Sequence, residues 1–279
     1  MIKFFKNIKG DFMKKIYGLF GKNISYSFSP LLHNEIFKIL DKQYEYKIFD
    51  IEKEEISFLI DKLRKNEDSG FNDTITYKQE IIKYLDEMSE NAKKIGAINT
   101  VYIKNNKIIG DNTDYYGFLK TVEKMNLNLK NRTVAILGTG GSAKAVVQVI
   151  KNLKGNIVVV SRNPNISDEY FKNFTLIDYE KLKSLSGELI VNCTPLGGKN
   201  QPNSSPIDEN TASNWNSAID LNYNPEISVF LSYFSDKPHS NGLYMLIAQG
   251  VQSEIIWQNK NILVDEVYNK VYNDVYTNK

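Results

Sequence analysis

The sequence is poor in the residues that bind structural metals or form disulfides. Its 279 residues include one cysteine, Cys193, and two histidines, His33 and His239. A single cysteine excludes an internal disulfide, and these side chains cannot fill a four-ligand zinc site without carboxylates. We therefore expect no metal site, and we interpret Cys193 as an unreactive thiol at the end of an apolar strand.

Long apolar runs and an excess of charge are also missing. No stretch approaches the roughly 20 apolar residues that span a bilayer, and the first dozen residues lack the features of a signal peptide. Lysine and arginine total 35 against 33 aspartate and glutamate, a formal net charge of +2. Such a balance supplies no basic field for nucleic acid. These absences predict a soluble, cytoplasmic protein with a small-molecule ligand, no nucleic acid or membrane partner, and either a monomeric or a homodimeric state.

The sequence does contain an alternation of short apolar runs and amphipathic stretches, which is typical of an α/β fold. One series begins at residue 15, and a second begins after the polar join at 126–131. We therefore expect two α/β domains around a cleft. Within the first series, the spacing of apolar residues predicts a single helix over 80–94.

A glycine-rich turn opens the second series. The apolar run 133–138 leads directly into Gly138, Gly140 and Gly141, and a helical stretch follows. Glycine permits a tight turn and close approach of the backbone to a diphosphate, and the helix N-terminus supplies N–H donors. The spacing departs from G-x-G-x-x-G only at Ala143, an accepted variant. The strand before and the helix after favour a dinucleotide-binding βαβ unit over a glycine-rich connector.

The end of the next apolar run, residues 156–160, indicates which dinucleotide binds. An NAD site typically has an acidic residue there for the ribose 2′-hydroxyl, but this sequence reads Ser161, Arg162, Asn163. A guanidinium pairs with a 2′-phosphate in a fork geometry that lysine does not reproduce. The chain has only three arginines, so the presence of Arg162 at this strand end favours a ligand of the NADP 2′-phosphate. The alternative is that Arg162 is an ordinary solvated surface residue.

Short polar residues follow the apolar runs of the first series. Ser29 stands before a proline and reads as a helix N-cap, which leaves Ser27 unexplained. In a strand, Asn72 and Thr74 share one face, and Lys78 follows just beyond. A polar face on a buried strand indicates a ligand, with ordinary turn chemistry as the alternative for each cluster taken alone.

Together these motifs resemble those of the shikimate dehydrogenase family, in the same order along the chain. The resemblance extends from residue 15 to the C-terminal helical stretches, and eight spaced motifs are far more specific than any one of them. They are G-x-x-I-x-x-S-x-S-P-x-x-H-N at 21–34, N-x-T-x-x-x-K at 72–78, G-A-x-N-T at 96–100, G-D-N-T-D at 110–114, G-x-G-G-x-A at 138–143, N-x-T-P-L-G at 192–197, D-x-x-Y-N-P at 220–225 and N-G-L-x-M-L-x-x-Q-G at 241–250.

The resemblance implies an oxidoreductase that reversibly reduces 3-dehydroshikimate to shikimate with NADPH, a step toward chorismate and the aromatic amino acids. It implies a substrate-binding and catalytic domain with a mixed sheet at 14–114 plus 243–279. It implies a doubly wound, Rossmann-like NADP-binding domain at 115–242, with 1–13 as an N-terminal extension. Lys78 would donate and accept the proton with Asp114 beside it, and no metal would take part.

Two sets of binding residues follow from the same resemblance. The substrate would contact Ser27, Ser29, Thr74, Lys78, Asn99, Asp114, Tyr223 and Gln249. The cofactor would contact Glu90, Gly138, Thr139, Gly140, Gly141, Ser142, Ala143, Ser161, Arg162, Asn163, Thr194, Pro195, Leu196, Leu221 and Gly242.

The sequence departs from the family pattern at several positions. Asp73 stands where an apolar residue is common, and strand alternation points it into the core, where an unpaired carboxylate costs several kcal/mol or takes up a proton. Thr76 replaces a proline, which removes a fixed φ near the catalytic lysine. Ile166 and Ser167 supply no second basic residue after Arg162, which predicts weaker selectivity for NADP.

Two alternatives fit the same motifs. A relative that oxidises quinate with NAD or NADP would share them, although Ser27 and Ser29 resemble the shikimate-selective pattern. A non-catalytic sensor of a shikimate-like ligand would explain Asp73, whereas Lys78 and Asp114 oppose that interpretation.

Overall fold

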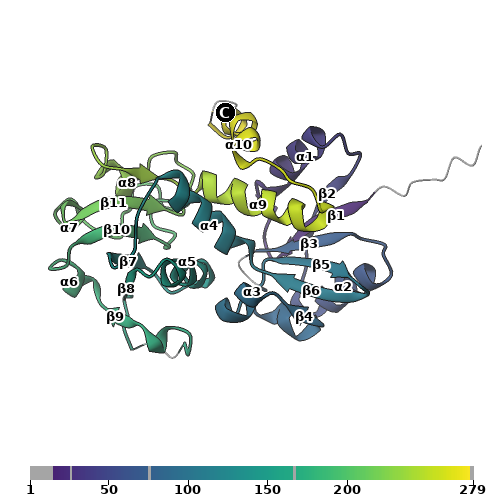
Figure 1. Cartoon of the computed structure of the whole chain (residues 1–279), viewed down its shortest axis with the longest axis horizontal. Coiled ribbons are helices and arrows are strands. Elements are labelled where there is room, and N and C mark those ends of the chain that lie inside the picture. The colour runs from purple at the N-terminus through teal and green to yellow at the C-terminus, as the bar shows by residue number, and fades with distance from the viewer. Residues whose placement is uncertain (1–14, 26, 75–76, 166–167, 277–279) are drawn as a thin grey trace, which may run out of the picture.

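The structure is a computed structural model that describes residues 15–25, 27–74, 77–165 and 168–276. Two six-stranded sheets organise these residues (Figure 1), and each has helices packed against it. The predicted α/β class, with two units, is thereby confirmed. The expected extension at 1–13 and the sequence departures at Thr76, Ile166 and Ser167 lie outside the described residues.

The first sheet is mixed, as expected, with the order β2-β1-β3-β5-β6-β4. Strands β2 and β3 run parallel to β1, whereas β5 is antiparallel to both β3 and β6. Its elements and their helices are β1 (Ile16–Gly21), α1 (Ser29–Ile39), β2 (Glu45–Asp50), η1 (Lys53–Glu55), α2 (Ile56–Arg64), β3 (Gly70–Asp73), η2 (Glu80–Tyr84), β4 (Glu87–Met88), α3 (Glu90–Ile95), β5 (Thr100–Lys104), β6 (Lys107–Asp111) and α4 (Thr113–Lys124).

The single helix expected over 80–94 is wrong. The segment forms the 3-10 turn η2, the short strand β4 and the helix α3, because Leu85 is extended, with φ −90° and ψ 147°. Strand β4 pairs with the free side of β6. Ser89 then starts a new helix, since its hydroxyl accepts a hydrogen bond from the backbone N–H of Ala92. Edge pairing and a new N-cap thus override a spacing that resembled one helix.

The second sheet is entirely parallel, with the order β9-β8-β7-β10-β11-β12. Numbered within this half, the order is 3-2-1-4-5-6, which is that of the Rossmann fold, and ligands bind where it reverses, between β7 and β10. The remaining elements are β7 (Thr133–Leu137), α5 (Gly141–Asn152), β8 (Asn156–Val160), η3 (Phe171–Asn173), β9 (Thr175–Ile177), α6 (Tyr179–Leu182), β10 (Gly187–Asn192), α7 (Glu209–Ser213), β11 (Trp215–Asp220), α8 (Val229–Ser232), β12 (His239–Ser240), α9 (Leu243–Gln258) and α10 (Val264–Tyr276).

Helices α4 and α9 lie side by side and connect the two halves (Figure 1). Their close approach depends on Gly117, where an added Cβ would lie 2.5 Å from the backbone oxygen of Met245. At its far end, α9 packs on the first sheet, since Trp257 stacks on Tyr17 and donates its Nε1–H to the backbone oxygen of Val101. The C-terminal chain therefore crosses from the second half back to the first.

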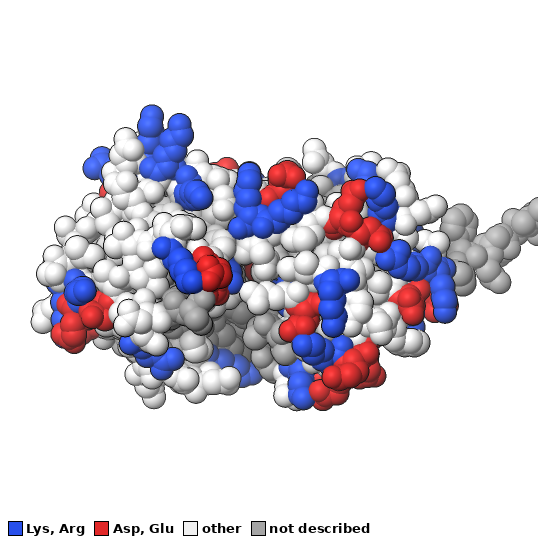
Figure 2. Space-filling view, turned by 90° about the horizontal axis from the view of Figure 1, so that it is seen from below, with Lys and Arg blue, Asp and Glu red and all other residues white. Residues whose placement is uncertain are grey.

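The surface carries both signs of charge. Acidic and basic side chains are intermingled over the face seen in Figure 2. Among the described residues, no helix is both long enough and apolar enough to cross a membrane, and no cluster of three histidine, cysteine, aspartate or glutamate side chains could hold a metal ion.

Candidate active site

A cavity of about 510 Å³ is lined by residues of both halves of the molecule. Its walls include the residue that ends β3, Asp73, and Leu221, which directly follows β11. The start of α5 and the face of α9 that carries Gln249 complete it. The cavity therefore lies at the carboxyl ends of strands, where open α/β sheets bind ligands.

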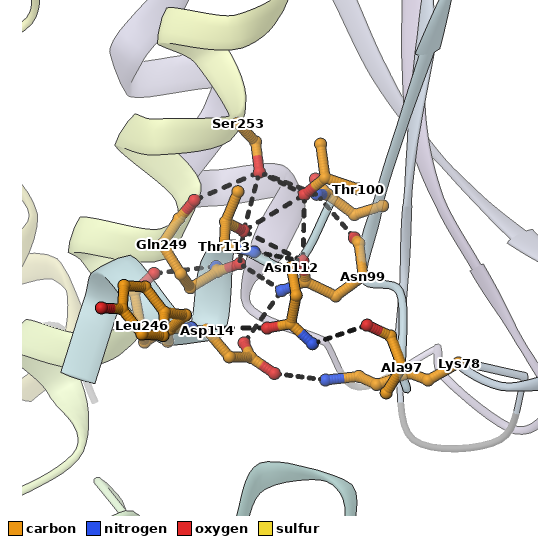
Figure 3. Close-up of polar contacts among 12 residues, drawn as sticks. Lys78, Ala97, Asn99, Thr100, Asn112, Thr113, Asp114, Leu246, Gln249 and Ser253 are labelled. Carbon is orange, nitrogen blue, oxygen red and sulfur yellow. Dashed lines mark hydrogen bonds and ion pairs between the residues drawn. The ribbon is translucent and has the colours of Figure 1, made fainter. Parts of the chain in front are cut away.

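An ion pair between Lys78 and Asp114 forms part of the cavity wall (Figure 3). The Nζ of Lys78 lies 2.5 Å from Oδ2 of Asp114, and each side chain is 13% exposed. The amide of Asn99 donates to the other carboxylate oxygen at 2.9 Å. Asp114 also lies in the first turn of α4, where the helix dipole favours a negative charge. The ammonium of Lys78 is therefore held in one position while part of it faces the cavity.

The lysine also lies next to the glycine-rich turn. Its backbone oxygen accepts a hydrogen bond from the N–H of Ile98 at 2.7 Å, which anchors the segment after β3. A Cβ added to Gly141, the first residue of α5, would lie 3.9 Å from Cδ of Lys78. Residues from the two halves therefore meet within van der Waals distance.

A polar network fixes Asn99 from behind (Figure 3). Its Oδ1 accepts the backbone N–H of Thr113 at 2.7 Å, and the Thr113 hydroxyl lies 3.3 Å from Oε1 of Gln249. The hydroxyl of Ser253 lies 2.9 Å from that of Thr100. The sequence interpretation missed Ser253, although it stands four residues after Gln249 on α9 and so on the same helix face.

Asn72 belongs to this network as well. Its Oδ1 accepts the hydroxyl of Tyr46 at 2.8 Å, and its amide donates to Ser253 at 2.9 Å. Tyr46 in turn stacks on His33, whose Nδ1 lies 2.6 Å from a carboxylate oxygen of the buried Glu254. Asn72 therefore positions its neighbours and also lines the cavity, as the polar face predicted from the sequence indicated.

Asp73 presents the problem expected from the sequence. Strand β3 ends at this residue, yet its side chain is 3% exposed, and neither carboxyl oxygen has a partner of full hydrogen-bond geometry among the described residues. Burial raises the pKa of Asp73 well above its ordinary value, while the charge of Lys78 and the backbone amides of Tyr77 and Thr74 oppose the shift. The carboxyl group therefore holds a proton more readily than an exposed aspartate does.

The two serines of the first motif lie together, but Ser29 is not the N-cap. Helix α1 begins at Ser29, and Phe28 occupies the capping position without a side-chain bond. The Ser27 hydroxyl instead donates to Oγ of Ser29 at 3.2 Å and accepts its backbone N–H. Ser29 lines the cavity and Ser27 does not. The capping expectation is wrong because the turn before the helix is closed by Ser27.

The other residues expected to bind substrate also line the cavity. They come from the segment after β3, the loop before β5, the start of α4, the loop after β11 and α9, and they are Thr74, Lys78, Asn99, Asp114, Tyr223 and Gln249. The backbone oxygen of Tyr223 accepts a hydrogen bond from the hydroxyl of Tyr276 on α10 at 2.7 Å. The C-terminal helix therefore helps to place the Tyr223 loop.

That loop also depends on the buried Asp220, the last residue of β11. Asp220 accepts hydrogen bonds from the side chains of Asn192, Asn222 and Ser228 at 2.5 to 3.0 Å. Burial raises the pKa of Asp220 to about 6, although these hydrogen bonds lower it. The D-x-x-Y-N-P and N-x-T-P-L-G motifs are thus joined through one carboxyl group.

The glycine-rich turn has the conformation that a diphosphate site needs. Gly138 has a φ of +102°, in the left-handed region that favours glycine. Gly140 precedes α5 without any side-chain cap, and a Cβ added there would meet no atom within 4 Å. The N-terminus of α5 therefore has uncapped N–H donors and open space in front of them, which fits a dinucleotide phosphate.

The residues expected to bind cofactor divide into two groups. Those that line the cavity are Thr139, Gly141, Ser142, Leu221 and Gly242. Those that do not are Glu90, Gly138, Gly140, Ala143, Ser161, Arg162, Asn163, Thr194, Pro195 and Leu196.

Two members of the second group, Arg162 and Glu90, are exposed in different halves of the molecule. Arg162 is the second residue after β8 and is exposed. Glu90 is 77% exposed at the start of α3, where it forms an ion pair with Lys93. Glu90 does not line the cavity, and its carboxylate is paired with the lysine three residues later on the same helix.

Lys144 and Asp168 line the cavity, and the sequence interpretation missed both. They form an ion pair with an Nζ to Oδ2 distance of 2.8 Å. The sequence feature that could have identified Lys144 is its position four residues after Gly140, in the first turn of α5.

Comparison with known proteins agrees with this geometry. A family profile described as the shikimate dehydrogenase substrate binding domain matches residues 19–101. A protein named Shikimate dehydrogenase (NADP(+)) from Clostridium beijerinckii is 37% identical over 248 residues, which is 88% of this chain and 92% of that protein. This chain belongs to the shikimate dehydrogenase family.

Solved structures of shikimate dehydrogenases share the whole arrangement. The chorismate mutase/shikimate 5-dehydrogenase fusion protein from Clostridium acetobutylicum superimposes with a TM-score of 0.90 at 38% identity, covering 94% of this chain and 98% of that one. Shikimate 5-dehydrogenase from Thermus thermophilus, in complex with NADP(H) and shikimate, gives a TM-score of 0.82 at 25% identity, covering 91% and 97%.

Proposed function

We propose that this chain catalyses the reversible, NADP-dependent reduction of 3-dehydroshikimate to shikimate. The observation that carries the proposal is the Lys78 and Asp114 ion pair, 2.5 Å long, in a cavity that also contains the first residues of α5. A proton donor and a phosphate-binding helix terminus then face one space. Membership of a family whose relatives are named shikimate dehydrogenase (NADP(+)) supports the substrate and the cofactor.

Lys78 is the proton donor of the reduction. As an ammonium it donates a proton to the ketone oxygen of the substrate, while the bound dinucleotide supplies the hydride to the carbon. In the oxidation of shikimate, neutral Lys78 accepts the hydroxyl proton. Asp114 holds the Nζ in place and stabilises its positive charge, and Asn99 fixes the carboxylate that does so.

The remaining polar side chains orient the substrate. Ser27 and Ser29 provide two adjacent hydroxyls, 3.2 Å apart, that suit the substrate carboxylate. The ring hydroxyls are contacted by Thr74, Asn99, Asp114, Tyr223 and Gln249, which surround the same cavity. Hydrogen bonds from several elements hold the ring in one pose, which positions its reacting carbon.

The chain divides by role. Residues 14–114 with 243–279 bind the substrate, and residues 115–242 bind NADP through the turn at 138–143, Arg162 and the loops that follow β10 and β11. The protein works in the cytoplasm as a monomer or homodimer, which cell fractionation and sedimentation would test.

The direct test is a spectrophotometric assay of the purified protein with shikimate or quinate and with NADP or NAD. We expect NADPH absorbance to appear with shikimate and NADP, at a higher kcat/KM than for any other pair. Absence of turnover with all four pairs contradicts the proposal, and a preference for quinate would move the chain to the related quinate-oxidising activity.

A further inference from the structure

We propose that Lys144 is a phosphate-binding residue of the cofactor site and that Asp168 is its partner when no cofactor is bound. Together they contribute, with Arg162, to the preference for NADP over NAD. This inference rests on the proposed function, because it concerns the cofactor of that same reaction. It adds a specificity-determining pair to the residues that the motifs identify.

The ammonium of Lys144 is held almost entirely inside the protein. Its side chain is 7% exposed, and its Nζ lies 2.8 Å from Oδ2 of Asp168, whose side chain is 37% exposed. The Nζ also lies 5.4 Å from the ring centre of Tyr170 and 5.9 Å from that of Phe171. Two aromatic faces and one carboxylate therefore hold a poorly hydrated positive charge at the cavity wall.

This charge lies against the segment that connects β8 to β9. Asp168, Tyr170 and Phe171 belong to the segment that connects β8 to β9, and the Tyr170 hydroxyl donates to the backbone oxygen of Lys144 at 2.8 Å. In a Rossmann fold, the carboxyl end of the second strand is where the ribose 2′ position is recognised. Lys144 of α5 is thus bound to the segment that begins at this strand end, which is the basis for assigning it to the 2′-phosphate.

The charges around the cavity leave Lys144 with a particular role. Among the described residues that line it, the cationic side chains are Lys78 and Lys144, and Lys78 is engaged by Asp114. An entering phosphate therefore has Lys144 as its cationic contact on this wall. A buried ammonium with a free phosphate forms strong, charge-assisted hydrogen bonds.

Asp168 opposes this contact until the phosphate arrives. Burial alone would raise the pKa of Asp168, but hydrogen bonds from Lys144 and from the backbone of Tyr170 lower it, so the carboxylate is charged at neutral pH. A phosphate at Lys144 must replace Asp168, whose partly exposed carboxylate can return to water. NADP supplies an extra phosphate for this exchange and NAD does not, so the exchange separates the two cofactors.

The test measures binding of NADP⁺ and NAD⁺ to the full chain by calorimetry at fixed ionic strength. The variants are Lys144→Met, Asp168→Asn and the double variant. The matched control is Lys151→Met, on the same helix and also beside an aromatic ring, Phe174, but exposed and outside the cavity.

We expect Lys144→Met to weaken NADP⁺ binding about tenfold or more and NAD⁺ binding less than about threefold, as loss of a charge-assisted hydrogen bond implies. Asp168→Asn should tighten NADP⁺ binding about threefold or more with little change for NAD⁺, and the gain should vanish in the double variant. Lys151→Met should change neither affinity.

Two results overturn the inference. One is an unchanged ratio of NADP⁺ to NAD⁺ affinity in Lys144→Met, whether both affinities fall together or neither does. The other is an unchanged or weakened NADP⁺ affinity in Asp168→Asn, a variant on a partly exposed loop that is informative even if Lys144→Met folds poorly. Either of these results, found while the unmodified chain binds NADP⁺ and oxidises shikimate, contradicts the inference and leaves the proposed function intact. If the unmodified chain neither binds NADP⁺ nor oxidises shikimate, the proposed function itself is contradicted.

Discussion

Lys78 and Asp114 stand 36 positions apart in the chain, yet the Nζ of one lies 2.5 Å from Oδ2 of the other. Lys78 follows β3, and Asp114 follows β6 at the start of α4. Because β5 pairs with both strands, it brings their ends together at one edge of the sheet. The ion pair between Lys78 and Asp114 is therefore a product of sheet pairing.

Replacement of Lys78 tests the proton donor. We expect Lys78→Met to lower kcat for shikimate oxidation about 10²- to 10⁴-fold, because general acid–base catalysis contributes that much. Calorimetry should find shikimate binding changed less than about tenfold. The control is Lys83→Met, an exposed lysine beside Tyr84. Turnover that survives in Lys78→Met would exclude the assigned role, and binding without turnover in the unmodified chain would favour a ligand sensor.

Replacement of Gly140 tests the phosphate turn. Its φ of −78° and ψ of −179° are open to any residue, and an added Cβ meets no atom within 4 Å. Gly140→Ala should therefore keep the melting temperature nearly unchanged. If a phosphate lies against this turn, NADP⁺ affinity should fall about tenfold or more while shikimate affinity stays the same. Equal NADP⁺ affinity in both proteins would place the phosphates elsewhere.

The raised pKa of Asp73 leads us to expect that the free energy of unfolding depends on pH. Its pKa is raised in the folded protein, so the folded state binds a proton more tightly than the unfolded state, in which an aspartate titrates near about 3.9. Its contribution to the free energy of unfolding is therefore largest below about pH 4 and declines as the pH rises toward the folded pKa.

Urea unfolding of Asp73→Asn across pH 4 to 8 measures this contribution. The advantage of the variant over the unmodified chain should grow as the pH rises toward the folded pKa of Asp73, because the ionised carboxylate is costly to bury. Asp61→Asn, at an exposed position of α2, is the control. A difference that is constant with pH would mean that Asp73 titrates alike in the folded and unfolded states.

Asp220 gives a titration that can be observed directly. Burial raises its pKa to about 6, so its carboxyl is protonated at pH 5 and ionised at pH 8. The infrared absorption of protonated carboxyl groups at pH 5 should be weaker in Asp220→Asn than in the unmodified chain, with the absorption of the buried Asp73 retained in both. Because the folded pKa lies above the unfolded value, stability should also fall by about 2–3 kcal/mol between pH 4 and 6 and level off above it. An absorption of equal intensity in the two proteins would assign the proton to another group.

Local patterns in the sequence were sufficient for most elements. The apolar run before Gly138 forms the buried strand β7. Helix α9 covers one of the helical stretches expected near the C-terminus. The failure over 80–94 has a specific cause. Apolar spacing reports which side chains are buried, but β4 forms because the edge of β6 needs a partner, and that edge exists only after the sheet assembles.

The residues of the site likewise divide into those that the sequence motifs identified and those that only the folded structure revealed. The motifs identified Lys78, Asp114 and Asn99, because short polar residues at strand ends carry a recognisable spacing. They did not identify Ser253 or Lys144, which lie in helices α9 and α5, outside the motif positions expected to contact a ligand. These side chains become significant only through what they face: Thr100 for the serine and Asp168 for the lysine.

The α/β class, the glycine-rich turn and the residue types available for proton transfer could be predicted from the sequence, because they depend on local periodicity and composition. Three features could be seen only in the folded chain: Lys78 meets Asp114, Glu90 lies away from the cavity, and Lys144 is paired with Asp168. Contacts between distant residues depend on strand order and helix packing, which no local spacing records.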